Sequence, residues 1–286
     1  MKTITLNSVP SNFKLYTKAL MPKKTNPKAD TLPDITYQLK NSTIDAEHVK
    51  KYNKTCGFKQ DDYVPACYPF LLAMPLVTSL VLEDRFPFKA MGMVHLSNEI
   101  TIKRKLFTGD VLDLKTYCGE IQVQEKGRVV PFYTEARRLG RVVWLCKTEI
   151  FFFGGGHKNK EDKPQTEALQ GESEIWSLKE GLGREYAGVS GDRNPIHLYP
   201  ITAKAFGFKR HIIHGMWTKA RVEAALAEKL PEQFTLRIDF KTPVFLPSKV
   251  RFTQLEGDGG IEYDIYNEKG EKPHARGFVS FGAGDN

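Results

Sequence analysis

The sequence has no cysteine pattern that would bind zinc or build a disulfide framework. Its four cysteines contain no Cys-x-x-Cys pair, and all of them precede the glycine-rich stretch that begins at Gly154. This argues against a zinc ribbon or a disulfide-stapled domain, and it is typical of a protein in a reducing cytoplasm. The cysteines are Cys56, Cys67, Cys118 and Cys146.

The sequence also lacks a long uninterrupted apolar run. The most apolar stretch, residues 68–82, contains Pro69 and Pro75 and is shorter than the roughly 20 residues that a membrane span needs. The first residues of the chain are polar and mixed, without the apolar core or cleavage site of a signal peptide. We therefore predict a buried helix within residues 68–82, no membrane association and a cytoplasmic location.

Positive charge is in excess, but it is not concentrated in one run. The formal net charge is +8, from 42 Lys and Arg against 34 Asp and Glu. The basic residues are scattered, and no nucleic-acid motif accompanies them, so we expect no nucleic-acid partner. The charge is compatible with a small phosphate-bearing ligand.

A segment poor in apolar residues divides the chain. Residues 154–173 begin with three glycines, continue with charged residues and contain Pro164. A segment of this composition cannot pack into a core, so it predicts a linker. Two domains are the natural expectation for 286 residues, and we place them at residues 1–153 and 174–286.

The two halves resemble each other. Residues 102–114 and 240–252 carry apolar residues and turn formers at identical spacing, and residues 52–58 parallel residues 186–192 further upstream. Two matches in the same order indicate a duplicated domain.

Each half also shows the same series of elements, namely a polar helix, irregular chain, an apolar helix and then alternating β segments separated by turn residues. This order favours an α+β architecture, an antiparallel sheet with one long helix across its face, present twice. The predicted helices lie near residues 46–53, 68–82, 177–186 and 216–226, and the predicted strands are residues 99–106, 111–118, 129–136, 142–153, 234–240, 249–255, 261–266 and 275–281.

Residues 190–197, SGDRNPIH, concentrate polar chemistry in a segment that cannot be a regular helix or strand. Its glycine permits a positive φ, and its Asn-Pro pair opens a turn. Asp192 and His197 therefore share one kinked loop. A neutral imidazole beside a carboxylate can hold a water molecule and move its proton at neutral pH, and Asn194 can orient either group.

A second histidine, His214, and Gly215 immediately precede an apolar run. Helix N-termini carry unpaired N–H groups and a partial positive charge, so the Gly215 N–H is predicted to bind an oxyanion. Taken singly, Asp192 could be a helix cap, Asn194 a turn former and each histidine an ordinary hydrogen-bonded one. Together they suit acid–base chemistry at the β-carbon of a thioester or ketone.

The stretches YAGVSGDRNPIH, AFGF and IIHGM, within residues 186–216, resemble the signature of the MaoC-like hydratases and dehydratases, which include the (R)-specific enoyl-CoA hydratases. The resemblance implies a double hot-dog fold here, because a hot-dog is an antiparallel sheet wrapped around a long central helix. It also implies reversible hydration of trans-2-enoyl thioesters to (R)-3-hydroxyacyl thioesters. Neither a metal nor a cofactor is expected, since coenzyme A enters as part of the substrate.

Carried over to this chain, the resemblance implies that Asp192 and His197 activate the water. Asn194 would help to orient them, and the Gly215 N–H would bind the thioester oxygen. The substrate-binding candidates are Ser190, His214, Lys209 and Arg210. Lys209 and Arg210 could meet a coenzyme A phosphate, and a solvated loop is the alternative for these two.

The first half looks like the partner copy of tandem hot-dog hydratases, in which one half has lost the catalytic loop. Phe58 stands at the position of Asp192, and no histidine follows at the spacing of His197. The resemblance implies a pseudo-dimer within one chain, whose helix at residues 68–82 lies beside the acyl chain. A homodimer of the whole chain is equally open.

Three alternatives stay open. The carrier could be an acyl carrier protein, which would make the protein a (3R)-hydroxyacyl-ACP dehydratase. A non-catalytic module that binds acyl thioesters is a second alternative, although the intact loop at residues 190–197 speaks against it. A thioesterase is the third, because other hot-dog proteins have this activity, but the sequence shows no separate thioesterase motif.

Overall fold

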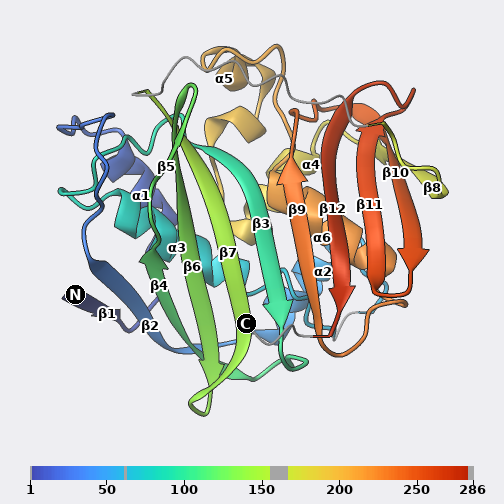
Figure 1. Cartoon of the computed structure of the whole chain (residues 1–286), viewed down its shortest axis with the longest axis horizontal. Helices are drawn as coiled ribbons and strands as arrows, with labels where there is room; N and C mark the ends of the chain where they lie inside the picture. The colour runs from blue at the N-terminus through green and yellow to red at the C-terminus, as the bar shows by residue number, and fades with distance from the viewer. Residues whose placement is uncertain (1, 61–62, 155–166, 283–286) are drawn as a thin grey trace. The chain divides into compact units, whose positions relative to one another are not determined.

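The structure is a computed structural model that describes residues 2–60, 63–154 and 167–282 (Figure 1). Most of the predicted linker at residues 154–173 lies outside these residues. The internal contacts of the described chain divide it into two compact units. The first unit holds residues 2–44, 69–99 and 110–154, and the second holds residues 45–60, 63–68, 100–109 and 167–282.

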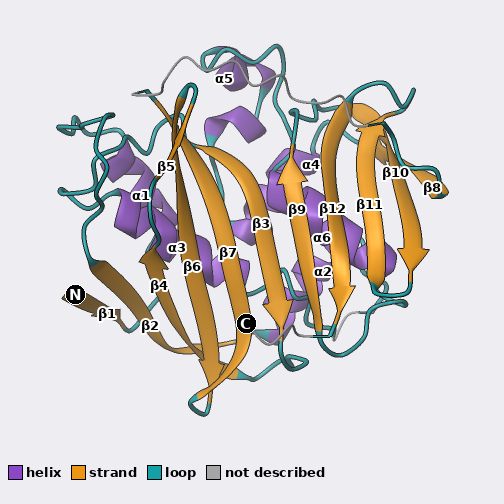
Figure 2. Ribbon diagram, viewed as in Figure 1, coloured by secondary structure: helices purple, strands orange, loops and turns teal. Residues whose placement is uncertain are grey.

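The first unit is a sheet with helices on one face (Figure 2). Its elements are β1 (Lys2–Leu6), α1 (Asn12–Ala19), β2 (Ile35–Thr43), α3 (Phe70–Val81), β3 (Val94–Ile102, whose last residues belong to the second unit), β4 (Val111–Cys118), β5 (Gln122–Gln124), β6 (Gly127–Arg138) and β7 (Arg141–Phe153). The strand order is β1-β2-β4-β6-β7-β3, with β5 paired to β6. Strand β1 is parallel to β2, and the pairings from β2 through β4 and β6 to β7 are antiparallel.

Helix α3 is the central helix of the first unit. It packs on β2 and β4, and eight of its 12 residues are buried. The predicted buried helix within residues 68–82 is therefore confirmed. Within the described part of the chain, neither α3 nor any other helix is long and apolar enough to cross a membrane.

The second unit repeats this plan with a shorter sheet (Figure 2). Its elements are α2 (Ala46–Cys56), β8 (Glu172–Leu178), α4 (Leu182–Ser190), the 3₁₀ turn η1 (Pro195–His197), α5 (Pro200–Lys204), α6 (Gly215–Leu226), β9 (Phe234–Phe240), β10 (Ser248–Gly257), β11 (Gly260–Asn267) and β12 (Pro273–Phe281). The strand order is β9-β12-β11-β10-β8, antiparallel throughout. Central helix α6 contacts β9 and is buried on most sides.

Helix α2 comes from the first half of the sequence but packs in the second unit, against α4 and α6. Its N-cap is Asp45, whose side chain accepts a hydrogen bond from the His48 N–H at 2.7 Å. Its buried face, which includes Val49 and Tyr52, supplies apolar area to the same core as α4. The first half of the chain thus contributes directly to the unit that carries the predicted catalytic loop.

The strands predicted from alternation are confirmed, with bounds that differ by a few residues at most ends. The predicted strand at residues 99–106 instead spans Val94–Ile102. The predicted helix at residues 177–186 begins only at Leu182, because Ser177 and Leu178 pair with Lys249 and Ser248 in the sheet. Main-chain pairing with a strand 70 residues away leaves no local trace in the sequence. Strands β1, β2 and β8 were not predicted, and neither was the three-residue β5, which is too short to show alternation.

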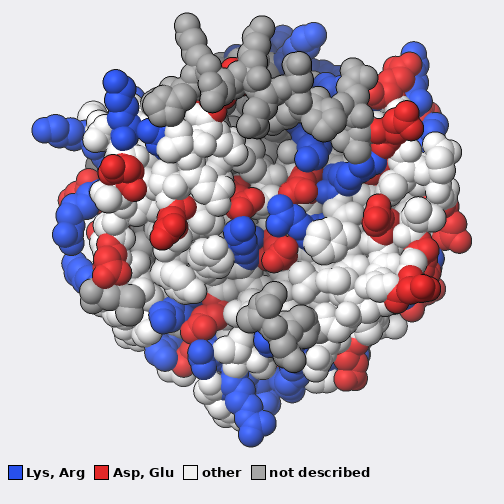
Figure 3. Space-filling view, in the orientation of Figure 1, with Lys and Arg blue, Asp and Glu red and all other residues white. Residues whose placement is uncertain are grey.

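Basic and acidic side chains are interspersed on the face of the molecule seen in Figure 3, and neither sign forms one continuous patch there. Many of them pair with each other. In the second unit, Lys229 lies 3.3 Å from Glu172 and 3.2 Å from Glu256. Exposed pairs of this kind contribute little to stability, and they show that part of the excess positive charge is locally compensated.

Candidate active site

Helices α2 and α4 end in the same way, as the internal match between the two halves predicts. Gly57 follows α2 with φ 85°, and its N–H bonds to the Asn53 carbonyl. Gly191 follows α4 with φ 73°, and its N–H bonds to the Ala187 carbonyl. Glycine favours this left-handed geometry because it has no Cβ. The two copies then differ in chemistry, because the next residue is Phe58 in the first copy and Asp192 in the second.

The loop after α4 is built from short side-chain-to-backbone hydrogen bonds. The Asp192 N–H donates to the Ser190 hydroxyl at 3.2 Å, and the Asn194 N–H donates to the Asp192 carboxylate at 3.1 Å. The Asn194 side chain accepts from the Ile196 N–H at 3.3 Å and caps η1. Ser190 and Asn194 therefore shape the turn that carries Asp192. The Asp192 side chain is 43% exposed.

His197 is buried, and its ring orientation is set by the backbone. Its Nδ1 lies 2.8 Å from the Ile212 carbonyl oxygen, which can only accept, so Nδ1 carries the hydrogen and Nε2 keeps a lone pair. Burial lowers the pKa of His197, and the Asp192 charge opposes that shift. The ring is therefore neutral at pH 7, in the tautomer that leaves Nε2 able to accept a proton.

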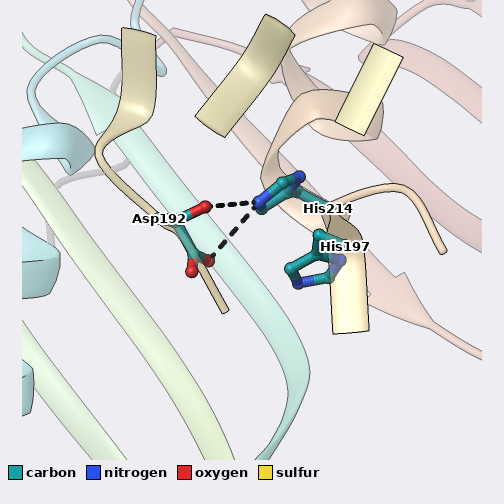
Figure 4. A group of neighbouring side chains, drawn as sticks. All are labelled: Asp192, His197 and His214. Atoms are coloured by element: carbon teal, nitrogen blue, oxygen red, sulfur yellow. Dashed lines mark hydrogen bonds and ion pairs between the residues drawn. The ribbon is translucent and has the colours of Figure 1, made fainter. Parts of the chain in front are cut away.

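His214 lies directly against His197 (Figure 4). The two rings are stacked, with centroids 3.7 Å apart, and the His214 Nε2–H donates to the Asp192 backbone carbonyl at 2.9 Å. Burial, then the neighbouring His197, lowers the pKa of His214 to about 3. At neutral pH the 3.9 Å approach of its Nε2 to the Asp192 carboxylate is therefore not an ion pair.

Gly215 begins α6, and His214 is its N-cap residue. A Cβ on Gly215 would lie 2.8 Å from the Phe240 ring, so glycine is needed here for close packing of the helix start on β9. This places a helix N-terminus, with its partial positive charge, next to the histidine pair.

Of the eight residues singled out in the sequence, the structure brings six into one cluster around the loop and the start of α6. The two basic candidates are different, because Lys209 and Arg210 are exposed. The Arg210 guanidinium lies over the Phe245 ring, 5.9 Å from its centroid. Neither has a described contact with the Asp192, His197 and His214 group.

Sequence reasoning missed two parts of this site. The Ile212 carbonyl, which orients His197, is a backbone atom and so has no sequence signal. Tyr186 lies within the quoted motif, and its ring packs on His214 with centroids 5.0 Å apart. Its position four residues before Ser190, on the buried face of α4, was the available signal.

The same three side chains could also hold a metal ion. One ligand atom from each of Asp192, His197 and His214 lies within 4.8 Å of the other two. A carboxylate with two imidazoles is a donor set that several divalent metals accept. The prediction that no metal takes part is therefore a matter for experiment.

The chain is similar to known proteins over most of its length. Residues 162–272 match the model of the MaoC-like domain. The chain is 33% identical over 251 residues to 3-hydroxyacyl-thioester dehydratase X of Mycobacterium tuberculosis, covering 87% of this chain and 90% of that one. These matches show that it is a member of the MaoC-like dehydratase family, as the sequence motif predicted.

Individual relatives support the fold and the enzyme class. The crystal structure of HtdX of Mycobacterium tuberculosis superposes with a TM-score of 0.74 at 31% identity, covering 85% of this chain and 98% of that one. A MaoC-like dehydratase from Phytophthora capsici, at 19% identity, gives 0.71 over 90% and 98% of the two chains and shows the shared fold. A 69-residue stretch, 23% of this chain and 52% of the relative, is 35% identical to the (R)-specific enoyl-CoA hydratase of Aeromonas caviae. The predicted α+β hot-dog architecture and the hydro-lyase class are confirmed.

Proposed function

We propose that the protein catalyses the reversible hydration of trans-2-enoyl thioesters to (R)-3-hydroxyacyl thioesters. The observation that carries the proposal is that the Asp192 carboxylate lies close to two neutral imidazoles, those of His197 and His214, near the start of α6. The names of the relatives, a 3-hydroxyacyl-thioester dehydratase and an (R)-specific enoyl-CoA hydratase, point to the same reaction.

The spacing of the acceptors suits a bound water molecule. A water that donates two hydrogen bonds of about 2.8 Å each joins acceptor atoms roughly 4.5 Å apart, and the ligand atoms of Asp192, His197 and His214 lie within 4.8 Å of one another. We assign the water to the Asp192 carboxylate and the His197 Nε2, because the His197 Nδ1 is already bonded to a carbonyl.

In the hydration direction the water oxygen bonds to C3 of the enoyl group while one of its protons passes to Asp192 or His197. The electron pair of the C2–C3 double bond moves toward the thioester carbonyl, and C2 then takes up a proton. The negative charge that develops on the thioester oxygen would be stabilised by the Gly215 N–H at the α6 N-terminus. Dehydration follows the same steps in reverse, and Asn194 would help to hold Asp192 in place through its backbone N–H.

We propose coenzyme A as the carrier, entering with the substrate, and no further cofactor. Ser190 and His214 would contact the substrate, and the exposed Lys209 and Arg210 would meet the phosphates of the nucleotide. Acyl carrier protein is the alternative carrier, since its acidic surface would also suit two exposed cations. We also infer a cytoplasmic protein in which the two halves, residues 1–153 and 174–286, act as one pseudo-dimer.

The proposal is tested by the loss of enoyl absorbance when the purified protein meets trans-2-butenoyl-CoA and longer trans-2-enoyl-CoA esters. We expect rapid loss, an (R)-3-hydroxyacyl product on chiral analysis, and no free thiol. His197→Gln should abolish the change. If no CoA ester reacts, the same assay with acyl carrier protein thioesters tests the alternative carrier, and release of free thiol would indicate a thioesterase instead.

A further inference from the structure

His48, on α2, makes two hydrogen bonds that join distant parts of the second unit. Its Nε2 lies 2.9 Å from the Val189 carbonyl oxygen, and its Nδ1 lies 2.8 Å from the Tyr68 hydroxyl. Because a carbonyl oxygen can only accept, Nε2 carries the hydrogen. Nδ1 then accepts from the Tyr68 O–H, so both ring nitrogens are occupied.

The first of these bonds lies at the base of the candidate active site. Val189 is the penultimate residue of α4, and Ser190, Gly191 and Asp192 follow it directly. The last carbonyls of a helix have no partner within the helix, and here His48 supplies one from outside. Together with the bond from Gly191 to Ala187, it fixes where the chain leaves α4 and therefore where Asp192 begins.

Packed aromatic rings connect the second bond to the histidine pair. Tyr68 contacts Tyr52 edge-on, with centroids 5.5 Å apart, and Tyr52 lies 6.2 Å from Tyr186. Tyr186 in turn packs on His214 at 5.0 Å. Tyr52 and Tyr186 are almost fully buried, so a displacement of His48 or Tyr68 has little free volume to absorb it.

We propose that His48 is a positioning residue that holds the end of α4 so that Asp192 meets His197 and His214. It is supplied by the half of the chain that lacks the catalytic loop. This inference rests on the proposed function. His48 does not act as an acid or base in it, because neither ring nitrogen is available to a substrate. The half without the catalytic loop would then act in the reaction through the backbone of the other half.

The test compares three substitutions at His48 that differ in which bond they keep. In His48→Gln the amide nitrogen can reach the place of Nε2 and donate to Val189. In His48→Asn the side chain is too short for that bond but can accept from Tyr68, and His48→Leu makes neither bond. Tyr68→Phe is the control, since it removes only the hydroxyl and keeps the bond to Val189.

Two measurements are made on each intact, purified variant: kcat and KM with trans-2-butenoyl-CoA, and amide hydrogen exchange of the segment 186–194. Losing one hydrogen bond that orients a reacting group is worth about 1.4 kcal/mol, or about tenfold in rate. We expect His48→Leu and His48→Asn to lower kcat about tenfold with KM nearly unchanged, and to speed exchange in 186–194. His48→Gln and Tyr68→Phe should stay close to the original protein in both.

The proposal is overturned if His48→Leu and His48→Asn keep full kcat, or if exchange in 186–194 does not change. It is also overturned if His48→Gln is as impaired as His48→Leu, because the bond to Val189 would then not be the cause. If the unaltered protein hydrates no thioester, the proposed function fails separately. The exchange measurement would still decide whether His48 holds the end of α4.

Discussion

The imidazole rings of His197 and His214 stack with their centroids 3.7 Å apart and their planes at 27°. Two charged imidazolium rings could not share this separation without strong repulsion, and burial already lowers both pKa values. The stack therefore exists only as two neutral rings at physiological pH. The neutral His197 ring keeps its Nε2 as a proton acceptor, because Nδ1 donates to the Ile212 carbonyl.

Asp192→Asn should keep the fold and remove most of the activity. The amide oxygen can still accept from the Asn194 N–H, so the loop should persist, but the negative charge beside His197 is lost. Positioned acid–base groups contribute roughly 10²–10⁴-fold to a rate, and a loss of kcat in this range is expected in the enoyl-CoA assay. Asp258→Asn, at an exposed β10–β11 turn, is the matched control and should be fully active. Full activity of a folded Asp192→Asn protein would refute the assigned role.

Stability should decline as pH falls below about 6.5. In the unfolded chain both histidines take up a proton near the usual pKa of 6.5, whereas in the folded protein His214 does so only near pH 3 and His197 below its usual value. The unfolded state therefore binds more protons between these limits, and the free energy of unfolding falls as pH is lowered through this window. Urea unfolding at pH 7.5, 6 and 5 measures the slope. His214→Gln should make the slope shallower, and an unchanged slope would contradict the buried neutral state.

Gly183→Ala should be strongly destabilising. A Cβ at Gly183 would lie 2.2 Å from the His197 carbonyl oxygen, a backbone atom that cannot move without displacing η1. Gly188, on the same helix, is exposed and has nothing within 4 Å of its Cβ position, so Gly188→Ala should stabilise by about 0.5–1 kcal/mol. Thermal unfolding of both variants gives the comparison. Equal effects of the two substitutions would show that α4 does not pack on η1 as described.

Glu223→Gln should destabilise the second unit by about 1–3 kcal/mol. The fully buried Glu223 carboxylate accepts from the Ala66 N–H at 2.5 Å and the Cys67 N–H at 2.9 Å, on its two different oxygens. Glutamine replaces one of these oxygens with a donor that would face an N–H group. Chemical unfolding measures the loss. Glu228→Gln, at an exposed side chain that pairs with Lys59, should have little effect. A neutral result for Glu223→Gln would mean that the carboxylate is protonated in the folded protein.

Activity should not depend on a metal ion. The proposed reaction uses Asp192 and His197 on a water molecule, although the atoms that they and His214 offer are close enough to hold a metal. Protein dialysed against EDTA should keep its full rate with trans-2-butenoyl-CoA, and added zinc should inhibit if it occupies the cluster. A rate that is lost with EDTA and restored by one metal would assign these residues as ligands instead.

Much of the fold followed from local patterns. The β-rich segments of β3, β4, β6, β7 and β9 to β12, the apolar run of α3 and the glycine after α4 are local signals, and each predicted its element. The strand β8 and the late start of α4 were missed, because Ser177 and Leu178 extend the sheet through pairing with residues 248–249. Local propensity carries no information about such a partner.

The chemistry available to this protein is visible in its amino-acid sequence: one SGDRNPIH loop, one His-Gly pair before an apolar helix, and a first half in which Phe58 replaces the acid. Residue type and short-range spacing define these features, so no tertiary contact is needed to find them. How these residues are oriented depends on tertiary contacts. The tautomer of His197 depends on the Ile212 carbonyl, and the neutral state of His214 depends on its burial. The Val189 carbonyl near the end of α4 is bonded by His48, which lies far earlier in the chain. Each is a contact between distant segments, which folding alone brings together.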